Sequence, residues 1–223
     1  MSIIHDDVVL GKNVTVESHC ILGHPTPLAD GRPLIIGDNS LVRSHSVLYA
    51  GSTFGSALTT GHHVTVREKI TAGDGLQVGT LSDLQGHTEF GDHVRMHSNV
   101  HVGQGSTIGS YVWIYPYSVL TNDPHPPSDH LEGVRVQDFA VIATMSCIMP
   151  GVTVGTRALV AAHSMVNRDV PADTIVGGVP AKELGPTSKV QLRDGNGPAY
   201  PWMRHFHRGY PADVVLEWRR TYM

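Results

Sequence analysis

Apolar residues recur at every sixth position over most of this chain of 223 residues. The longest unbroken series has fifteen members and fourteen of them are apolar, whereas a 40 % apolar composition would place about six there by chance. A period of six fits neither the turn of an α-helix nor a heptad. The members of the series are Ile36, Val42, Leu48, Phe54, Thr60, Val66, Ala72, Val78, Leu84, Phe90, Met96, Val102, Ile108, Ile114 and Leu120.

Each hexad predicts a short strand followed by a corner, because side chains alternate between the two faces of a strand. One hexad cannot bury its apolar face alone, so successive hexads must stack into a parallel β-helix. A β-sandwich of short strands is the alternative, but it would not hold one phase over so many units. Glycine often follows the apolar position, and we attribute this to backbone angles at the corner that other residues avoid.

The register breaks twice, at insertions spanning 24–34 and 121–135, and it ends after Leu184. We therefore expect an all-β domain over 1–184, followed by a linker and a C-terminal helical extension over 185–223. An amphipathic helix is predicted from Ala212 to Tyr222. It would pack on a neighbouring coil or subunit, or else contact the substrate.

Composition narrows the function further. The formal net charge is −4, which gives no electrostatic footprint for nucleic acid. Two cysteines do not make a disulfide scaffold, and no apolar stretch is long enough to span a membrane. The start of the chain has no basic region followed by an apolar run, as a signal peptide would. These features predict a soluble, cytoplasmic protein.

The repeat over roughly residues 8–184 resembles that of the hexapeptide-repeat acyltransferases. The stretch NVHVGQGSTIGSYVWIYPYSVLTNDPHPPSD is similar to the galactoside and maltose acetyltransferases, and its TND also resembles the nucleotide-sugar N-acetyltransferases. The resemblance implies a left-handed β-helix with eighteen residues per triangular coil, assembled as a homotrimer. It further implies transfer of an acetyl or other short acyl group from acyl-CoA to an amine or hydroxyl. The acceptor would be a small molecule, such as a sugar or an aminated metabolite.

Carried over residue by residue, the resemblance implies that His125 is the general base and that Asn99 orients the substrate. A histidine suits the role of base because its pKa lies near working pH. The loop also places Asp123 among the substrate-binding candidates. The two branches of the family differ over whether a loop histidine is used, so a reaction without a side-chain base stays open.

The last coils resemble the edge of these enzymes that binds the coenzyme. Small side chains at corners let backbone amides approach pantetheine, which implicates Ala143, Thr144 and Ala162. The closing Pro-Ala-Lys segment points to Lys182 as the group that meets coenzyme phosphates. Acetyl-CoA is thus the expected co-substrate, and no metal is expected.

The length of the coil indicates a second group of candidate site residues. Eighteen residues per coil stack Asp83 directly beneath His101, both facing outward. The pair could contact a substrate or a neighbouring subunit, or it could be a surface ion pair of little energetic value. His45 and His63 stack in the same way and are interpreted as a structural ladder. Trp113 and Val119 are expected to be exposed, outward-facing apolar residues at a subunit contact.

Two other functions fit the same fold. One is a zinc carbonic anhydrase, but no two histidines are 36 residues apart, as two stacked coils would require. His97 and His101 without a third ligand make a weak zinc site. The other is a scaffold subunit that has lost catalysis, against which the retained loop and the closing Pro-Ala-Lys segment argue.

Overall fold

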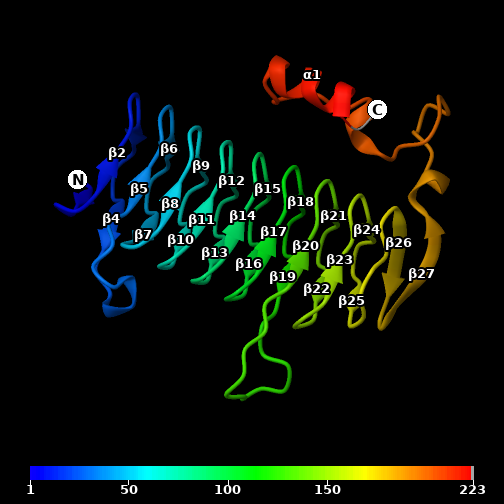
Figure 1. The fold of residues 1–223 in the computed structure, drawn as a ribbon, viewed down its shortest axis with the longest axis horizontal. Coiled ribbons are helices and arrows are strands. Elements are labelled where there is room, and N and C mark those ends of the chain that lie inside the picture. The colour runs from blue at the N-terminus through cyan, green and yellow to red at the C-terminus, as the bar shows by residue number, and fades with distance from the viewer. Residues whose placement is uncertain (222–223) are drawn as a thin grey trace.

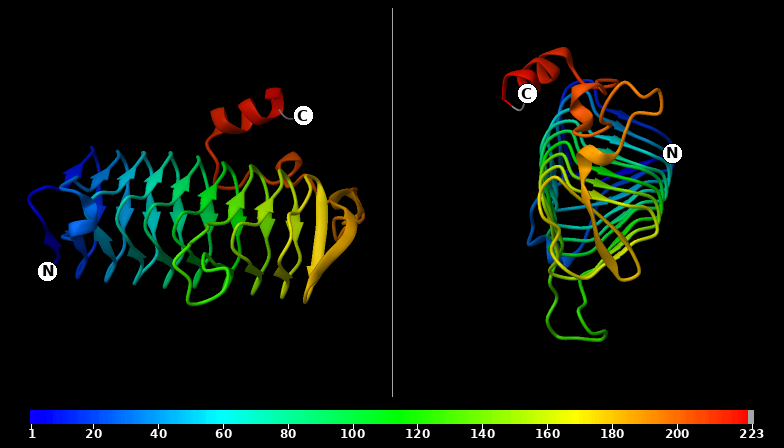
Figure 2. Two further views of the ribbon diagram at one scale, coloured as in Figure 1. Left: turned by 60° about the horizontal axis from the view of Figure 1, so that its bottom comes forward. Right: turned by 90° about the vertical axis from the view of Figure 1, so that its right-hand side faces the viewer.

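The computed structural model describes residues 1–221 and confirms an all-β solenoid with one short C-terminal helix. The chain winds through three parallel sheets, and each turn adds one strand to each sheet (Figure 1). Two features depart from the stack. A loop projects from one corner, and the C-terminal segment returns over one face (Figure 2).

The strands of residues 1–221 fall into these three sheets. Sheet A contains β1 (Ile3–Ile4), β4 (Ile21–His24), β7 (Val47–Tyr49), β10 (Thr65–Val66), β13 (Asp83–Leu84), β16 (His101–Val102), β19 (Val119–Leu120), β22 (Cys147–Ile148) and β25 (Met165–Val166). Sheet B contains β2 (Val9–Leu10), β5 (Ile35–Ile36), β8 (Thr53–Phe54), β11 (Thr71–Ala72), β14 (Glu89–Phe90), β17 (Thr107–Ile108), β20 (Arg135–Val136) and β23 (Thr153–Val154). Sheet C contains β3 (Thr15–Val16), β6 (Leu41–Val42), β9 (Thr59–Thr60), β12 (Gln77–Val78), β15 (Arg95–Met96), β18 (Trp113–Ile114), β21 (Val141–Ile142), β24 (Leu159–Val160), β26 (Thr174–Gly178) and β27 (Ala181–Pro186).

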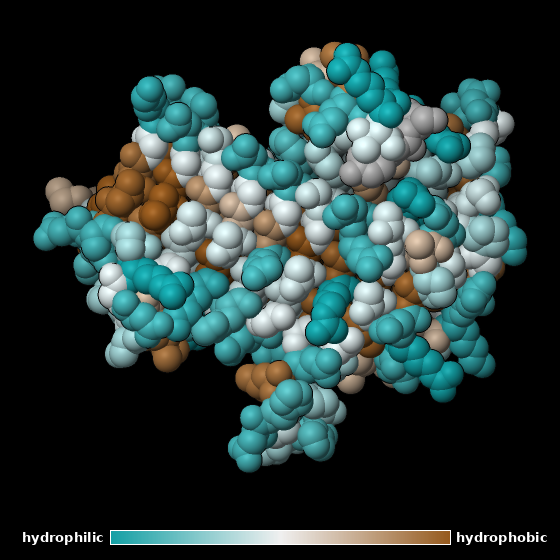
Figure 3. Space-filling view, viewed as in Figure 1, coloured by the Kyte–Doolittle hydropathy of each residue, from teal (hydrophilic) through white to brown (hydrophobic). Residues whose placement is uncertain are grey.

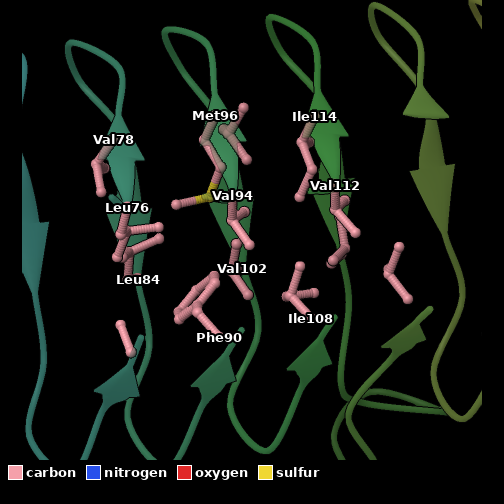
Figure 4. Packing of buried hydrophobic residues seen from close by; sticks show 14 of the residues in the cluster. Leu76, Val78, Leu84, Phe90, Val94, Met96, Val102, Ile108, Val112 and Ile114 are labelled. Carbon is pink, nitrogen blue, oxygen red and sulfur yellow. The ribbon is translucent and has the colours of Figure 1, made fainter. Parts of the chain in front are cut away.

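The six-residue series forms the core. Every one of its fifteen members is at most 6 % exposed, and the side chains from successive coils interdigitate along the axis (Figure 4). Thr60, the polar member, is fully buried, and its hydroxyl accepts a hydrogen bond from the backbone N–H of Arg43 at 2.9 Å. The buried hydroxyl is thus satisfied, as a polar group in an apolar core must be.

The reason for the corner glycines differs from our expectation. The glycines that follow the inward residues do not have positive φ, and an added Cβ at Gly37 would lie 2.5 Å from the backbone of Gly55. Close stacking of neighbouring coils therefore requires these glycines, rather than special backbone angles. The left-handed corner positions are instead occupied mostly by other residues, including Asn99 (φ 60) and His63 (φ 55).

Both insertions lie where the sequence predicts them. The first contains the short 3₁₀ helix η1 (Pro27–Ala29), and Asp30 at its end pairs with Lys69 of the main stack at 2.6 Å. The second joins β19 to β20 and projects away from the prism (Figure 1).

The C-terminal segment folds back onto sheet C. It includes η2 (Thr187–Lys189), η3 (Trp202–Arg204) and helix α1 (Ala212–Thr221). The predicted helix is confirmed over this range, whereas Tyr222 lies outside the described residues. Its role against a neighbouring coil is also confirmed, since it joins an aromatic cluster with outward residues of sheet C, comprising Phe139, Val141, Trp202, Met203, Tyr210, Val215 and Trp218.

The extension corrects one expectation. Trp113 is only partly exposed, because its indole N–H donates to the Tyr210 hydroxyl at 2.9 Å and its ring packs on Phe206. The boundary at 184/185 stays a prediction. Strand β27 crosses it, pairing antiparallel with β26 as a hairpin on the last coil.

The face shown in Figure 3 is largely polar, and its most extensive apolar patch lies at the N-terminal end of the β-helix. Ile4 and Leu10, the inward residues of the first described coil, are 47 % and 36 % exposed, because no other coil of residues 1–221 covers them. Within residues 1–221, no helix combines the length and apolar character needed to cross a bilayer.

Candidate active site

One corner of the prism brings most of the predicted residues together. In each coil this corner joins a sheet C strand to the next sheet A strand, and we call it the CA corner. The residue after each two-residue sheet C strand, and Gly177 at the equivalent position within β26, form a column along this corner, because the strands stack in register. From the N-terminal end the column reads Glu17, Arg43, Gly61, Gly79, His97, Tyr115, Ala143, Ala161 and Gly177.

The upper part of the column carries only small side chains. Ala143 and Ala161 stack beneath Gly177, where an added Cβ would lie 3.2 Å from the Cβ of Ala161. Thr144 and Ala162 occupy the next position of the same two coils. Alanine leaves the backbone of these two coils little covered, whereas the Leu184 side chain lies over Gly177.

Lys182 lies at the same end. It pairs with Gly177 across the β26–β27 hairpin, and its side chain is exposed. The structure thus brings together all four residues predicted to bind the coenzyme, Ala143, Thr144, Ala162 and Lys182, at the upper end of the CA corner. Their role in binding stays a prediction.

The face of sheet A next to this corner carries the stacked pair. His101 Nδ1 lies 3.0 Å from Asp83 Oδ2, and the same carboxylate oxygen accepts from Gln85 Nε2 at 2.6 Å. The hydrogen bond from His101 is the main cause that lowers the pKa of Asp83 below its ordinary value. An ionised carboxylate can only accept, so Nδ1 carries the hydrogen. In a neutral ring Nε2 then bears the free lone pair.

This pair stays open to solvent. The side chains of His101 and Asp83 are 41 % and 36 % exposed, and Nε2 makes no hydrogen bond within residues 1–221. The predicted stacking is confirmed. Such a half-exposed pair contributes little stability. Its chemical capacity is the more useful property, since the carboxylate fixes the tautomer and the orientation of the imidazole.

Asn99 and His125 lie at different corners. Asn99 is on the CA corner, two residues before His101, with its backbone N–H bonded to the carbonyl of Thr80. His125 is exposed on the projecting loop at the opposite edge of sheet A. No contact joins them in the described chain, so one protomer by itself does not assemble this pair.

Asp123 forms hydrogen bonds within that loop. Its carboxylate accepts from the Ser128 hydroxyl at 2.8 Å and from the backbone N–H groups of His125 and Ser128, both at 3.3 Å. These bonds hold the loop that presents His125. A direct contact between Asp123 and a substrate stays a prediction.

An aromatic cavity beside the corner was not predicted from the sequence. A space of about 380 Å³ lies between sheet C and the C-terminal extension, lined by Trp113, Tyr115, Tyr200, Trp202 and Phe206 among others. Tyr115 belongs to the column itself and stacks on His97 with ring centroids 4.7 Å apart. The sequence features that could have indicated this cavity are the aromatic residues at outward positions of sheet C and the segment PWMRHF in the C-terminal extension.

Histidines elsewhere are arranged as rings in contact. His19, His45 and His63 stack in successive coils with centroids 4.9 and 4.6 Å apart, which confirms the structural ladder. Residues 1–221 contain no group of three or more His, Cys, Asp or Glu side chains placed to hold a metal ion. The zinc-enzyme alternative therefore gains no support from the described residues.

Known proteins with similar sequences include an N-acetyltransferase. The chain is 38 % identical over 93 residues to a 2,3,4,5-tetrahydropyridine-2,6-dicarboxylate N-acetyltransferase of Staphylococcus aureus, covering 42 % of this chain and 33 % of that protein. It is 31 % identical over 168 residues to the bifunctional protein GlmU of an Exiguobacterium species, covering 75 % of this chain and 35 % of that protein. The chain thus spans about a third of the length of these relatives. No protein-family model matches it.

Among solved structures, an Arabidopsis UDP-N-acetylglucosamine acyltransferase superposes with a TM-score of 0.62 at 16 % identity. The match covers 83 % of this chain and 72 % of that one, and it establishes a shared fold. The comparisons thus show that the chain shares its β-helix fold with this acyltransferase, and that it is similar in sequence to parts of an N-acetyltransferase and of GlmU.

Proposed function

We propose that the protein transfers an acetyl or other short acyl group from acyl-CoA to an amine or hydroxyl of a small acceptor. The observation that carries this proposal is the oriented imidazole of His101, next to a corner whose column ends in Ala143, Ala161 and Gly177. Met145 and His163 are exposed on the same coils and would border the coenzyme. The similarity to an N-acetyltransferase over 93 residues supports the same chemistry.

In this reaction a base removes the proton from the acceptor nitrogen or oxygen, which attacks the thioester carbonyl. The tetrahedral intermediate then collapses, the C–S bond breaks, and the thiolate takes up the proton. The geometry favours His101 as the base, because Asp83 holds Nδ1 and leaves Nε2 free to accept. Asn99, two residues away on the corner, would orient the acceptor through its side-chain amide.

His125 stays the base predicted from the family pattern. Its loop stands at the far edge of sheet A, so His125 would serve an active site on a neighbouring copy of the chain. We therefore propose a homotrimer in which each loop reaches the CA corner of the next protomer. Val119, half-exposed on sheet A, replaces Trp113 as the apolar contact expected at that interface. A monomer mass in solution at micromolar concentration would contradict this assembly.

The donor is proposed to be acetyl-CoA, with Lys182 placed to meet its phosphates. An amine acceptor agrees with the name of the Staphylococcus aureus relative, an N-acetyltransferase. The cytoplasmic location predicted from composition fits a protein that uses this coenzyme.

Two measurements test the proposal. Coenzyme A and acetyl-CoA should raise the melting temperature, since a ligand that binds the native state stabilises it. Acetyl transfer should then be detected by mass spectrometry against a panel of amino sugars, sugars and amino acids. A folded protein that shows neither effect would refute acyl transfer.

The base is identified by comparing His101→Gln with His125→Gln at saturating donor. Loss of the base should reduce turnover by about 10²–10⁴-fold and remove the rising limb of the pH profile. The other variant should keep that limb. If both variants keep it, neither histidine is the base, and an acceptor amine that is already deprotonated accounts for the rate.

A further inference from the structure

A second hollow lies nearer the N-terminal end of the CA corner, outside the proposed coenzyme site. It has a volume of about 610 Å³ and extends over sheet C beneath the turn at residues 206–209. This volume lies within the range of about 300–1,000 Å³ that small-molecule sites occupy. We call this hollow the arginine groove, and the proposed reaction assigns no role to it.

No side chain covers the backbone at the centre of the groove, because two successive coils have glycine in the corner column. An added Cβ at Gly61 would lie 2.3 Å from the nitrogen of Thr80, and one at Gly79 would lie 2.2 Å from the carbonyl carbon of His97. A side chain at either position would require the neighbouring backbone to shift. The two glycines therefore leave this part of the corner open.

The charge of the groove has one sign. Arg43 lies at its lower end, Arg95 and Arg208 lie at its upper end, and no acidic side chain from residues 1–221 lines it. Arg43 and Arg208 also have no ion-pair partner within the described part of the chain. Two guanidinium groups are therefore available to an anion that enters the groove.

Arg95 has a different role, since it fixes the roof. Its guanidinium lies 4.0 Å from the centre of the Tyr210 ring and donates to the backbone carbonyls of Arg208 and Gly209. The Trp113–Tyr210 hydrogen bond of 2.9 Å holds the same turn. These contacts place Arg208 over the groove, so the C-terminal extension completes it.

The remaining lining is rich in hydroxyl and amide groups. Thr59 and Gln77 face outward from sheet C, and Thr80 and Ser98 lie on the corner. Such groups exchange hydrogen bonds with hydroxyls, whereas guanidinium groups form charge-assisted bonds to phosphate. The packed rings of Trp113 and Phe206, 5.5 Å apart, belong to both this groove and the aromatic cavity above it.

We propose that the arginine groove binds a small polyhydroxylated anion, of the class of sugar phosphates, with its phosphate on Arg43 or Arg208. The groove lies on the same corner as the proposed coenzyme site at Ala143, Ala161 and Gly177, and the stacked rings of His97 and Tyr115 separate the two. A ligand in the groove would therefore lie next to the end of the coenzyme site where the acyl group arrives. On this basis, which rests on the proposed function, the bound anion is the acyl acceptor or a close analogue of it.

Binding is tested by calorimetry on the full chain without coenzyme, using glucose 6-phosphate as the probe and glucose and inorganic phosphate as comparators. Glucose 6-phosphate should bind more tightly than either comparator, and its affinity should fall as salt rises. Gln77→Glu should weaken binding at least tenfold, and so should Arg43→Gln or Arg208→Gln, whichever arginine holds the phosphate. Arg193→Gln, an exposed arginine outside the groove, is the matched control and should change nothing.

Absence of binding at millimolar probe would overturn the site, as would equal affinity in the wild type and the three groove variants. Phosphate that binds as tightly as the sugar phosphate would overturn the proposed ligand class. The acceptor role is tested separately, with acetyl-CoA and glucosamine 6-phosphate. Acetylation of neutral amines by a protein that binds no sugar phosphate would leave acyl transfer standing and remove the groove. Binding without any acetyl transfer would retain the groove and remove its acceptor role.

Discussion

Replacing Trp218 by alanine should release the C-terminal extension while the β-helix stays folded. Trp218 is fully buried in the aromatic cluster that holds helix α1 on sheet C, with ring centroids 4.6 Å from Tyr210 and 5.2 Å from Tyr111. Truncation of a buried tryptophan costs about 3–5 kcal/mol. Since about 1.4 kcal/mol is a factor of ten, hydrogen exchange of the helix amides should accelerate by about 10²–10⁴-fold.

The assay is hydrogen exchange with peptide resolution, alongside thermal unfolding. Leu216→Ala on the same helix is the control, since Leu216 is 52 % exposed and should leave exchange nearly unchanged. Amides of sheets A and B should keep their protection in both variants, because the β-helix has a separate core. Unchanged protection of residues 212–221 in Trp218→Ala would refute the docking of the extension. Equal acceleration throughout the chain would refute its independence from the β-helix.

Three further predictions test other parts of the molecule. Lys182→Glu should raise the dissociation constant of coenzyme A by about tenfold without altering the melting temperature, and an unchanged constant in calorimetry would remove Lys182 from the site. Because the pKa of Asp83 is lowered in the folded state, its ionised form stabilises the fold above the ordinary value of 3.8, and this contribution is lost as the pH falls through the lowered pKa. The melting temperatures of wild type and Asp83→Asn should therefore converge below about pH 4, and a constant difference down to pH 2 would contradict this. Thr60→Val should destabilise the protein by about 1–3 kcal/mol in denaturant unfolding, because the N–H of Arg43 loses its acceptor. An unchanged or raised stability would mean that this N–H bonds to the backbone carbonyl of residue 60 instead.

The fold could be predicted because it is periodic. A single phase of six places each inward residue, and the resulting coil length stacks Asp83 under His101. Thr60 interrupts the apolar series yet keeps its position, since its hydroxyl replaces the carbonyl that usually accepts the N–H of the preceding coil. Periodicity also locates both insertions, as the segments where the phase is lost.

The C-terminal contacts could not be predicted, because nothing in the local sequence encodes them. Trp113 and Tyr210 are 97 residues apart, and the outward phase of Trp113 alone indicates an exposed side chain. The aromatic cavity and the arginine groove both depend on where the extension docks. For the same reason, the sequence could group Asn99 with His125 only through a family pattern, although they lie at opposite edges of sheet A.

The most direct test of the central claim is acyl transfer itself, with acetyl-CoA, the acceptor panel and the wild-type and His101→Gln proteins compared by mass spectrometry. The account predicts an acetylated product that depends on both substrates, formed by wild type and reduced by about 10²–10⁴-fold in the variant. If the wild-type protein is folded and neither binds coenzyme A nor acetylates any amine or hydroxyl in the panel, the account is wrong.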